Sequence, residues 1–189
     1  TPALTITTPP PQITPVVYIV KVTDVIDGDT IDVQFLDVLY EGKTYERVRM
    51  LGIDTPETTA SKNKPYEYDD ITDLECLAYW GKKAKEYVKE KLEGKKAEIE
   101  FDRLAPERGY YGRLLAYVYY VEGDKVYDFT AELVKKGYAR VYTEAKFERE
   151  EKYIEYQKEA MEKNLGLWSC RSGAITAPTT TYTTPNAKG

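Results

Sequence analysis

The chain has 189 residues, which is room for one domain of ordinary size with its own hydrophobic core. Hydrophobic residues make up 42% of it and charged residues 31%, a globular composition. It contains no histidine, which excludes a Ser-His-Asp or Cys-His nucleophile, a histidine general base and a zinc or copper site with histidine ligands. Carboxylates, Lys, Arg, Tyr or a metal held by oxygen must therefore carry any chemistry.

The charge balance is acidic, with 27 Lys and Arg against 32 Asp and Glu and a formal net charge of −5. Proteins that coat nucleic acid by bulk electrostatics are usually basic, so the balance argues against that class. It leaves open an enzyme that binds a polyanion through a few placed cations and a bridging metal. No run of 18 or more apolar residues and no apolar signal-peptide core occurs, so we expect no membrane span and a mature or excised fragment.

Composition divides the chain into three parts. Residues 1–15 hold five Pro and five Thr, and residues 171–189 hold six Thr and two Pro. Both are typical of extended linkers, and we favour extracellular stalks that lead to flanking domains over ragged termini. Residues 16–170 then form the folded domain, with 25 basic and 32 acidic side chains and a net charge of −7.

The first half of this domain predicts a β-meander followed by a helix. Alternating β-branched residues predict three strands, at Val16–Val25, Thr30–Val38 and Thr44–Leu51. The polar stretch from Thr58 to Ile71 has no period and predicts a loop. Thr72 and Glu75 have the spacing of a capping box, at the start of a helical pattern that ends at Gly94.

The second half predicts further strands and helices. The strands are Ala97–Phe101, Leu114–Val121 and a short Lys125–Tyr127, and the helices run from Asp128 to Lys136 and from Phe147 to Lys163. A small, strongly bent barrel fits this order of elements. We therefore expect a mainly β fold with helices, in the α+β class: a five-stranded OB-fold barrel closed by about three helices.

Three short segments concentrate charge where strands end. They are Asp27-Gly28-Asp29-Thr30, the segment from Arg49 to Glu57, and Tyr110-Tyr111-Gly112-Arg113. Taken singly, each also fits a solvated turn or a loop start. In this order, with Arg49 five residues before Asp54, they resemble the signature of the staphylococcal nuclease (thermonuclease) family, the SNase-like domains. The resemblance covers roughly residues 17–169 and leaves only the tails unmatched.

A divalent cation is the first expectation for these segments. Two carboxylates on neighbouring strand ends, a backbone carbonyl and waters would satisfy Ca²⁺, and Asp29, Asp54 and Thr55 offer the protein oxygens. The resemblance implies that these three positions are the calcium ligands. It places Asp27 behind them, where a carboxylate orients ligands or water. A plain turn residue describes Asp27 equally well.

Three further residues complete the expected catalytic set. Without imidazole, a carboxylate must accept or position the proton of the attacking water, and the resemblance implies that Glu57 is this general base. Positioning the water without accepting its proton is a weaker role that stays open. Guanidinium groups match the equatorial oxygens of a five-coordinate phosphorus, and the resemblance assigns Arg49 and Arg113 to the scissile phosphate. A surface ion pair is the alternative for each arginine.

Tyrosines are the expected nucleotide contacts. The resemblance implies that Tyr111 contacts a phosphate, and a phenol can also stack on a base. Tyr142 falls near the family's second nucleotide-facing tyrosine, with an alignment that can slip by one residue. The chain departs from the family in having Tyr110 where a basic residue is expected, and in a longer loop at Thr58–Ile71 with an acidic end.

The two cysteines, Cys76 and Cys170, are too few for a metal site. Together with the Pro/Thr stalks and a family that looks secreted, they favour a disulfide over two buried thiols. The bridge would close a loop of 94 residues, worth roughly 4 kcal/mol in the chain-entropy model. Abundant Glu and Lys with few Asn or Gln also favours high thermal stability.

These features predict a secreted or surface-tethered, monomeric, Ca²⁺-dependent nuclease. By resemblance it hydrolyses single-stranded and double-stranded DNA and RNA and leaves 3′-phosphate ends. The main alternative is a non-catalytic binding module for nucleic acid or protein on the same barrel. Such a module is expected to lack some of Arg49, Glu57 and Arg113, and this chain keeps all three. A passive cell-surface spacer is the third hypothesis, and it predicts no activity with any metal.

Overall fold

The computed structural model describes residues 15–172. The segments predicted as linkers, 1–15 and 171–189, lie outside the described residues except for positions 15, 171 and 172. Within the described range, no helix combines the length and the apolar composition needed to cross a membrane.

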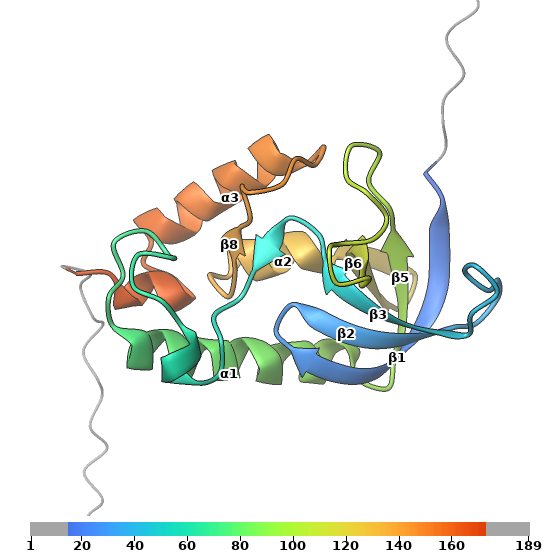
Figure 1. Ribbon diagram of the computed structural model, residues 1–189, viewed down its shortest axis with the longest axis horizontal. Helices are drawn as coiled ribbons and strands as arrows, with labels where there is room; N and C mark the ends of the chain where they lie inside the picture. Colours follow the sequence, from blue (N-terminus) through green and yellow to red (C-terminus); the bar gives the residue numbers. More distant parts are fainter. Residues whose placement is uncertain (1–14, 173–189) are drawn as a thin grey trace, which may run out of the picture.

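Five strands close into a small barrel, which lies towards the right of Figure 1. They are β1 (Val17–Asp27), β2 (Thr30–Phe35), β3 (Tyr45–Met50), β5 (Lys96–Glu100) and β6 (Leu114–Glu122). Neighbours pair antiparallel in the order β3-β2-β1-β5-β6, and β6 closes the ring by pairing in parallel with β3. The predicted five-stranded OB-fold barrel is confirmed.

Irregularities in β1 allow this closure. Its register against β2 shifts between Val22 and Asp24, and again between Val25 and Asp27. An extra residue at such a bulge bends the strand and increases its twist, which a barrel of five strands requires. The second shift lies directly before the turn that carries the first acidic motif.

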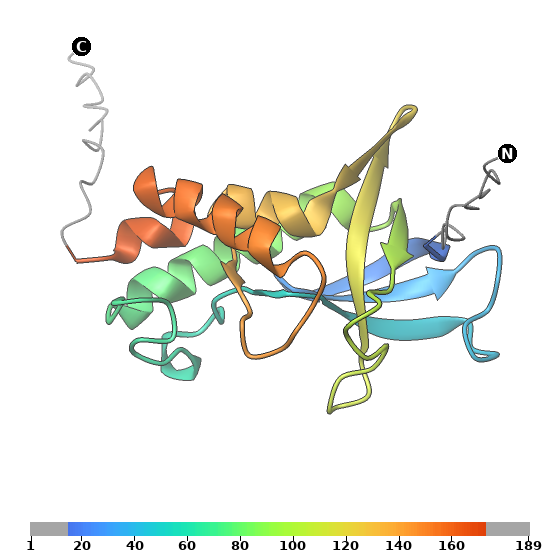
Figure 2. The same ribbon diagram turned by 90° about the horizontal axis from the view of Figure 1, so that it is seen from above.

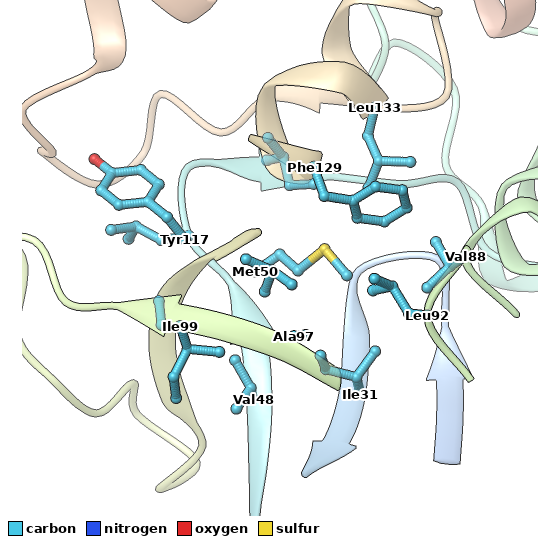
Figure 3. Packing of buried hydrophobic residues seen from close by; sticks show 14 of the residues in the cluster. Ile31, Val48, Met50, Val88, Leu92, Ala97, Ile99, Tyr117, Phe129 and Leu133 are labelled. Atoms are coloured by element: carbon cyan, nitrogen blue, oxygen red, sulfur yellow. The ribbon is translucent and has the colours of Figure 1, made fainter. Parts of the chain in front are cut away.

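The hydrophobic core fills the barrel and the space under two helices, α1 (Leu74–Leu92) and α2 (Phe129–Lys135) (Figure 3). The strand residues labelled there are Ile31, Val48, Met50, Ala97, Ile99 and Tyr117, and the helix residues are Val88, Leu92, Phe129 and Leu133. All of them are buried: the strands direct alternate side chains into the barrel, and the two helices cover it with their apolar faces.

The remaining elements extend this core. They are β4 (Ile53–Asp54), β7 (Lys125–Asp128), β8 (Arg140–Val141), α3 (Glu150–Glu162) and the 3₁₀ helices η1 (Ala60–Lys62) and η2 (Gly166–Cys170). β7 forms a hairpin with β6, and β4 pairs antiparallel with β8. The pairing of β4 with β8 was not predicted, because a strand of two residues has no period to detect.

Two predicted helix starts are wrong. Helix α1 is capped by Asp73 rather than by Thr72, since the carboxylate of Asp73 accepts the backbone N–H of Cys76 at 3.0 Å. Helix α3 begins at Glu150 rather than at Phe147, whose ring is buried against Gly52. The cap predicted for α2 is confirmed, because Asp128 accepts the N–H of Ala131 at 3.0 Å.

A second, smaller hydrophobic cluster lies beyond the barrel, at the N-terminal end of α1. Its buried members are Tyr68, Ile71, Leu77, Ala160, Leu167 and Trp168. The predicted disulfide is present beside it, joining Cys76 to Cys170 with 5.8 Å between the Cα atoms. The stretch predicted as a polar loop is mostly exposed, but Tyr68 and Ile71 near its end are buried against residues of α1, α3 and η2.

Candidate active site

Strand pairing brings the three charged motifs together. In the register of the barrel, Arg49 on β3 lies opposite Thr30 on one side and Leu115 on the other. Arg49 therefore lies between the Asp-Gly-Asp turn and the chain that follows Arg113. The loops 55–71, 102–113 and 142–149 project from the same side of the molecule (Figure 2).

Asp29 is the most enclosed carboxylate of the site, with 7% of its surface exposed. Its Oδ2 accepts the backbone N–H of Thr55 at 3.1 Å and lies 3.1 Å from Nη1 of Arg49. Its Oδ1 accepts the hydroxyl of Thr30 at 2.9 Å. These contacts fix the turn after β1 against the segment that begins at Asp54.

Arg49 joins two carboxylates. Besides its contact with Asp29, its Nη2 lies 3.2 Å from Oδ1 of Asp54, and its Nη1 donates to the carbonyl of Ile53 at 2.8 Å. The guanidinium group therefore lies between the two predicted metal ligands. In this position it neutralises part of their charge.

The other oxygen of Asp54 has two donors that the sequence did not reveal. Oδ2 lies 3.0 Å from Nε of Arg140 on β8 and accepts the hydroxyl of Tyr68 at 3.2 Å. Arg140 also forms an ion pair with Glu144 at 3.0 Å. A tyrosine in an acidic stretch and an arginine two residues before Tyr142 were the only sequence signals, and neither indicates a partner.

Helix α1 supports the backbone around Glu57. A Cβ atom added to Gly81 on this helix would lie 2.5 Å from the carbonyl oxygens of Pro56 and Glu57, so glycine is required there. The side chain of Asn63, which is buried, accepts the N–H of Glu57 at 2.9 Å and donates to its carbonyl at 3.0 Å. The backbone is thereby fixed while the Glu57 side chain stays exposed.

Negative charge accumulates at this site. Partial burial and then the charges of Asp27, Asp29 and Asp54 raise the pKa of Glu57. Burial followed by the charge of Asp29 raises the pKa of Asp27. Burial likewise raises the pKa of Asp54, against the lowering effect of Arg49. Burial is the largest cause at all three carboxyls and repulsion between carboxylates adds to it, and a bound cation would offset both effects.

The donor set fits a hard cation that keeps several waters. Within residues 15–172, no three Asp, Glu, Cys or His side chains converge on one point. Two carboxylates on either side of a cationic group, with the Thr55 backbone beside Asp29, are oxygen donors of the kind that Ca²⁺ and Mg²⁺ take. Asp29, Asp54 and Thr55 are thus brought together as predicted.

A pocket of about 290 Å³ adjoins Arg49. The predicted phosphate and nucleotide residues line it: Arg49, Arg113, Tyr111 and Tyr142, together with Tyr110. Tyr142 is held there because its backbone N–H donates to the carbonyl of Gly52 at 2.9 Å. Apolar side chains from β3, β4 and β6 form the floor, so the pocket combines cationic, aromatic and apolar walls.

Arg113 differs from Arg49 in its surroundings. Among residues 15–172 it forms no ion pair, and its guanidinium carbon lies 5.9 Å from the centre of the Tyr111 ring. Tyr111 and Tyr110 are 81% and 97% exposed. The cationic and aromatic groups on this side of the pocket are therefore available to a ligand.

Comparison with known proteins identifies the family of this chain. Residues 47–170 match the family model described as staphylococcal nuclease homologue. The uncharacterized protein MJ1439 of Methanocaldococcus jannaschii is 40% identical over 80% of this chain and 72% of its own length. Endonuclease YncB of Bacillus subtilis is 39% identical over 80% of this chain and 61% of its own length. Thermonuclease of Staphylococcus intermedius is 35% identical over 80% of this chain and 75% of its own length. The chain belongs to the staphylococcal nuclease homologue family.

Proposed function

We propose that this domain is a Ca²⁺-dependent phosphodiester hydrolase that acts on DNA and RNA and leaves 3′-phosphate ends. One observation carries the proposal: Arg49 is bound to Asp29 and Asp54 at the edge of a pocket that Arg113 and two tyrosines also line. The names of the endonuclease and thermonuclease relatives support the reaction class. The product type and the calcium preference rest on the family resemblance.

Asp29, Asp54 and the carbonyl of Thr55 would hold the cation, which supplies positive charge beside a phosphate oxygen. Arg49 and Arg113 lie on the same pocket and offer planar donors to the non-bridging oxygens, where negative charge grows in the transition state. Tyr111 and Tyr142 hold the nucleotide by stacking or by phosphate contact.

Glu57 accepts the proton of the attacking water in this proposal. Burial and the charges of Asp27, Asp29 and Asp54 raise the pKa of the Glu57 carboxyl, and this supports the role because a carboxylate of higher pKa is a stronger base. Asn63 holds both the N–H and the carbonyl of Glu57, so the side chain extends from a fixed backbone position beside the site.

Digestion of single-stranded DNA and RNA with Ca²⁺, Mg²⁺ or chelator, followed by analysis of the new ends, tests the proposal. We expect cleavage with Ca²⁺, 3′-phosphate ends, and a loss of about 10²-fold or more in Glu57→Gln. Glu90→Gln, on the exposed face of α1 nine residues beyond Gly81, is the matched control and should keep full activity. Full activity of Glu57→Gln, or undiminished cleavage in chelator, would contradict the mechanism.

We also propose that the domain works outside the cell as a monomer. The disulfide between Cys76 and Cys170 supports an oxidising compartment, because such bridges are rare in the cytosol of most organisms. Fractionation of the native host and sedimentation of the purified chain test the two statements separately. Recovery in the cytosolic fraction would overturn the first, and a dimer at working concentration would overturn the second.

A further inference from the structure

The loop before α1 makes a contact that links the second hydrophobic cluster to the candidate metal site. Tyr68 is 1% exposed, yet its hydroxyl donates to Oδ2 of Asp54 at 3.2 Å. Arg140 donates to the same oxygen at 3.0 Å, and its guanidinium carbon lies 5.4 Å from the centre of the Tyr68 ring. One carboxylate oxygen is thus held by two donors that also contact each other.

The position of Tyr68 is fixed independently of Asp54. Its ring belongs to the second cluster, which includes Trp168 and is bridged by the nearby disulfide. Its backbone carbonyl accepts the N–H of Ile71 at 3.1 Å, and the carbonyl of Ile71 accepts the N–H of Tyr66 at 2.9 Å. The phenol is therefore a rigid donor that does not depend on the carboxylate for its place.

The two hydrogen bonds to Oδ2 of Asp54 also fix the direction of its other oxygen, Oδ1. Asp54 rotates about its side-chain torsions only by breaking both bonds to Oδ2, so Oδ1 stays directed towards Arg49, which Asp29 also contacts. A cation that takes Oδ1 as a ligand then meets a pre-arranged oxygen and loses less conformational entropy on binding.

We propose that Tyr68 and Arg140 are positioning residues that fix the Asp54 carboxylate for a divalent cation. The inference rests on the proposed function, because it takes Asp54 as a ligand. It gives the long loop at Thr58–Ile71 a role in cation affinity rather than in substrate contact. Removing either donor is expected to weaken cation binding.

Tyr68→Phe removes the hydroxyl and keeps the ring. Its matched control is Tyr117→Phe, because Tyr117 on β6 is also 1% exposed and donates to a carboxylate, that of Asp102 in the loop after β5, at 2.6 Å. Calorimetric titration of the whole chain with CaCl₂ gives the dissociation constant, and thermal unfolding in chelator gives the stability of each variant. We expect Tyr68→Phe to bind Ca²⁺ about tenfold more weakly and Tyr117→Phe to bind it as the parent does.

Arg140→Lys provides a second route if Tyr68→Phe is poorly folded. It keeps the charge and removes the Nε donor, so we expect weaker Ca²⁺ binding here too. Unchanged Ca²⁺ affinity in a folded Tyr68→Phe or Arg140→Lys, or an equal loss in Tyr117→Phe, would overturn the positioning role while the proposed function stands. A parent chain that cleaves DNA but binds no divalent cation would overturn the calcium assignment and, with it, this inference.

Discussion

Arg49 and Arg113 line the same pocket but are held in opposite ways. The side chain of Arg49 is 15% exposed and contacts two carboxylates and a backbone carbonyl. Arg113 forms no ion pair among residues 15–172 and lies beside an exposed tyrosine on a surface loop. The barrel register places the first arginine, whereas loop contacts place the second. We therefore distinguish two halves of the site. In the prepared half, around Arg49, contacts within the protein already hold the side chain. In the ligand-facing half, around Arg113, the side chain is available to a ligand instead.

The largest expected effect is on catalysis in the ligand-facing half. Arg113→Ala should lower kcat/KM about 10³-fold, because a developing charge in the transition state loses a donor. Its free energy of unfolding should change by less than about 0.5 kcal/mol, since the side chain has no charged partner within the described residues. Steady-state cleavage and urea unfolding measure the two quantities. A large loss of stability would show that Arg113 belongs to the prepared half.

Arg49→Ala, unlike Arg113→Ala, should lower the free energy of unfolding substantially. Asp29 and Asp54 would then be left largely buried without their shared cationic partner, which costs about 3 kcal/mol in chelator. Adding Ca²⁺ should restore part of the lost stability, because the bound dication would neutralise Asp29 and Asp54 in place of Arg49. Urea unfolding with and without Ca²⁺ measures both. Equal stabilities for Arg49→Ala and Arg113→Ala would remove the distinction between the two halves.

A smaller effect is expected from the ion pair that anchors the Arg113 loop. Arg108 lies 2.6 Å from Oε1 of Glu46 on β3 and donates to the carbonyl of Gly112 at 2.8 Å. Arg108→Met should lower kcat/KM about tenfold by displacing Arg113, with Ca²⁺ affinity unchanged. Arg47→Lys, in an exposed pair on the same strand, is the control. An unaltered kcat/KM would mean that the loop keeps its place without this ion pair.

The smallest effect concerns Tyr110, where the family resemblance leads us to expect a basic residue. Tyr110→Lys should tighten binding of single-stranded DNA a few-fold at low salt and steepen the slope of log K against log salt by about 0.7, as expected for one added phosphate contact. Stability should not change, because Tyr110 is 97% exposed. Fluorescence titrations at four salt concentrations measure the slope. An unchanged slope would show that the side chain at position 110 does not contact the phosphates of the DNA backbone.

Short-range patterns in the sequence predicted the barrel strands, and the family resemblance implied the residues of the site around Arg49. Strand alternation predicted β1, β2, β3, β5 and β6, and the resemblance to the staphylococcal nuclease family implied that Asp29, Asp54 and Arg49 share one site. The strand predictions succeed because alternating apolar residues in the sequence correspond to the alternation of side chains between the two faces of a strand.

Tyr68 and Arg140 were missed for a physical reason. Their contacts with Asp54 span 14 and 86 residues, and they depend on how the second cluster and the two-residue strand β8 pack. No local pattern reports such packing. The true cap of α1 was missed because Thr72 and Asp73 are adjacent residues with similar capping ability, and only the geometry selects Asp73.

Calcium titration of the parent chain and of Asp54→Asn tests the central claim most directly. The account predicts one Ca²⁺ per parent chain, affinity at least tenfold weaker in Asp54→Asn, and cleavage of single-stranded DNA that falls in parallel at a fixed, subsaturating Ca²⁺ concentration. Parent affinity in Asp54→Asn, or cleavage that continues at the parent rate in chelator, would contradict it.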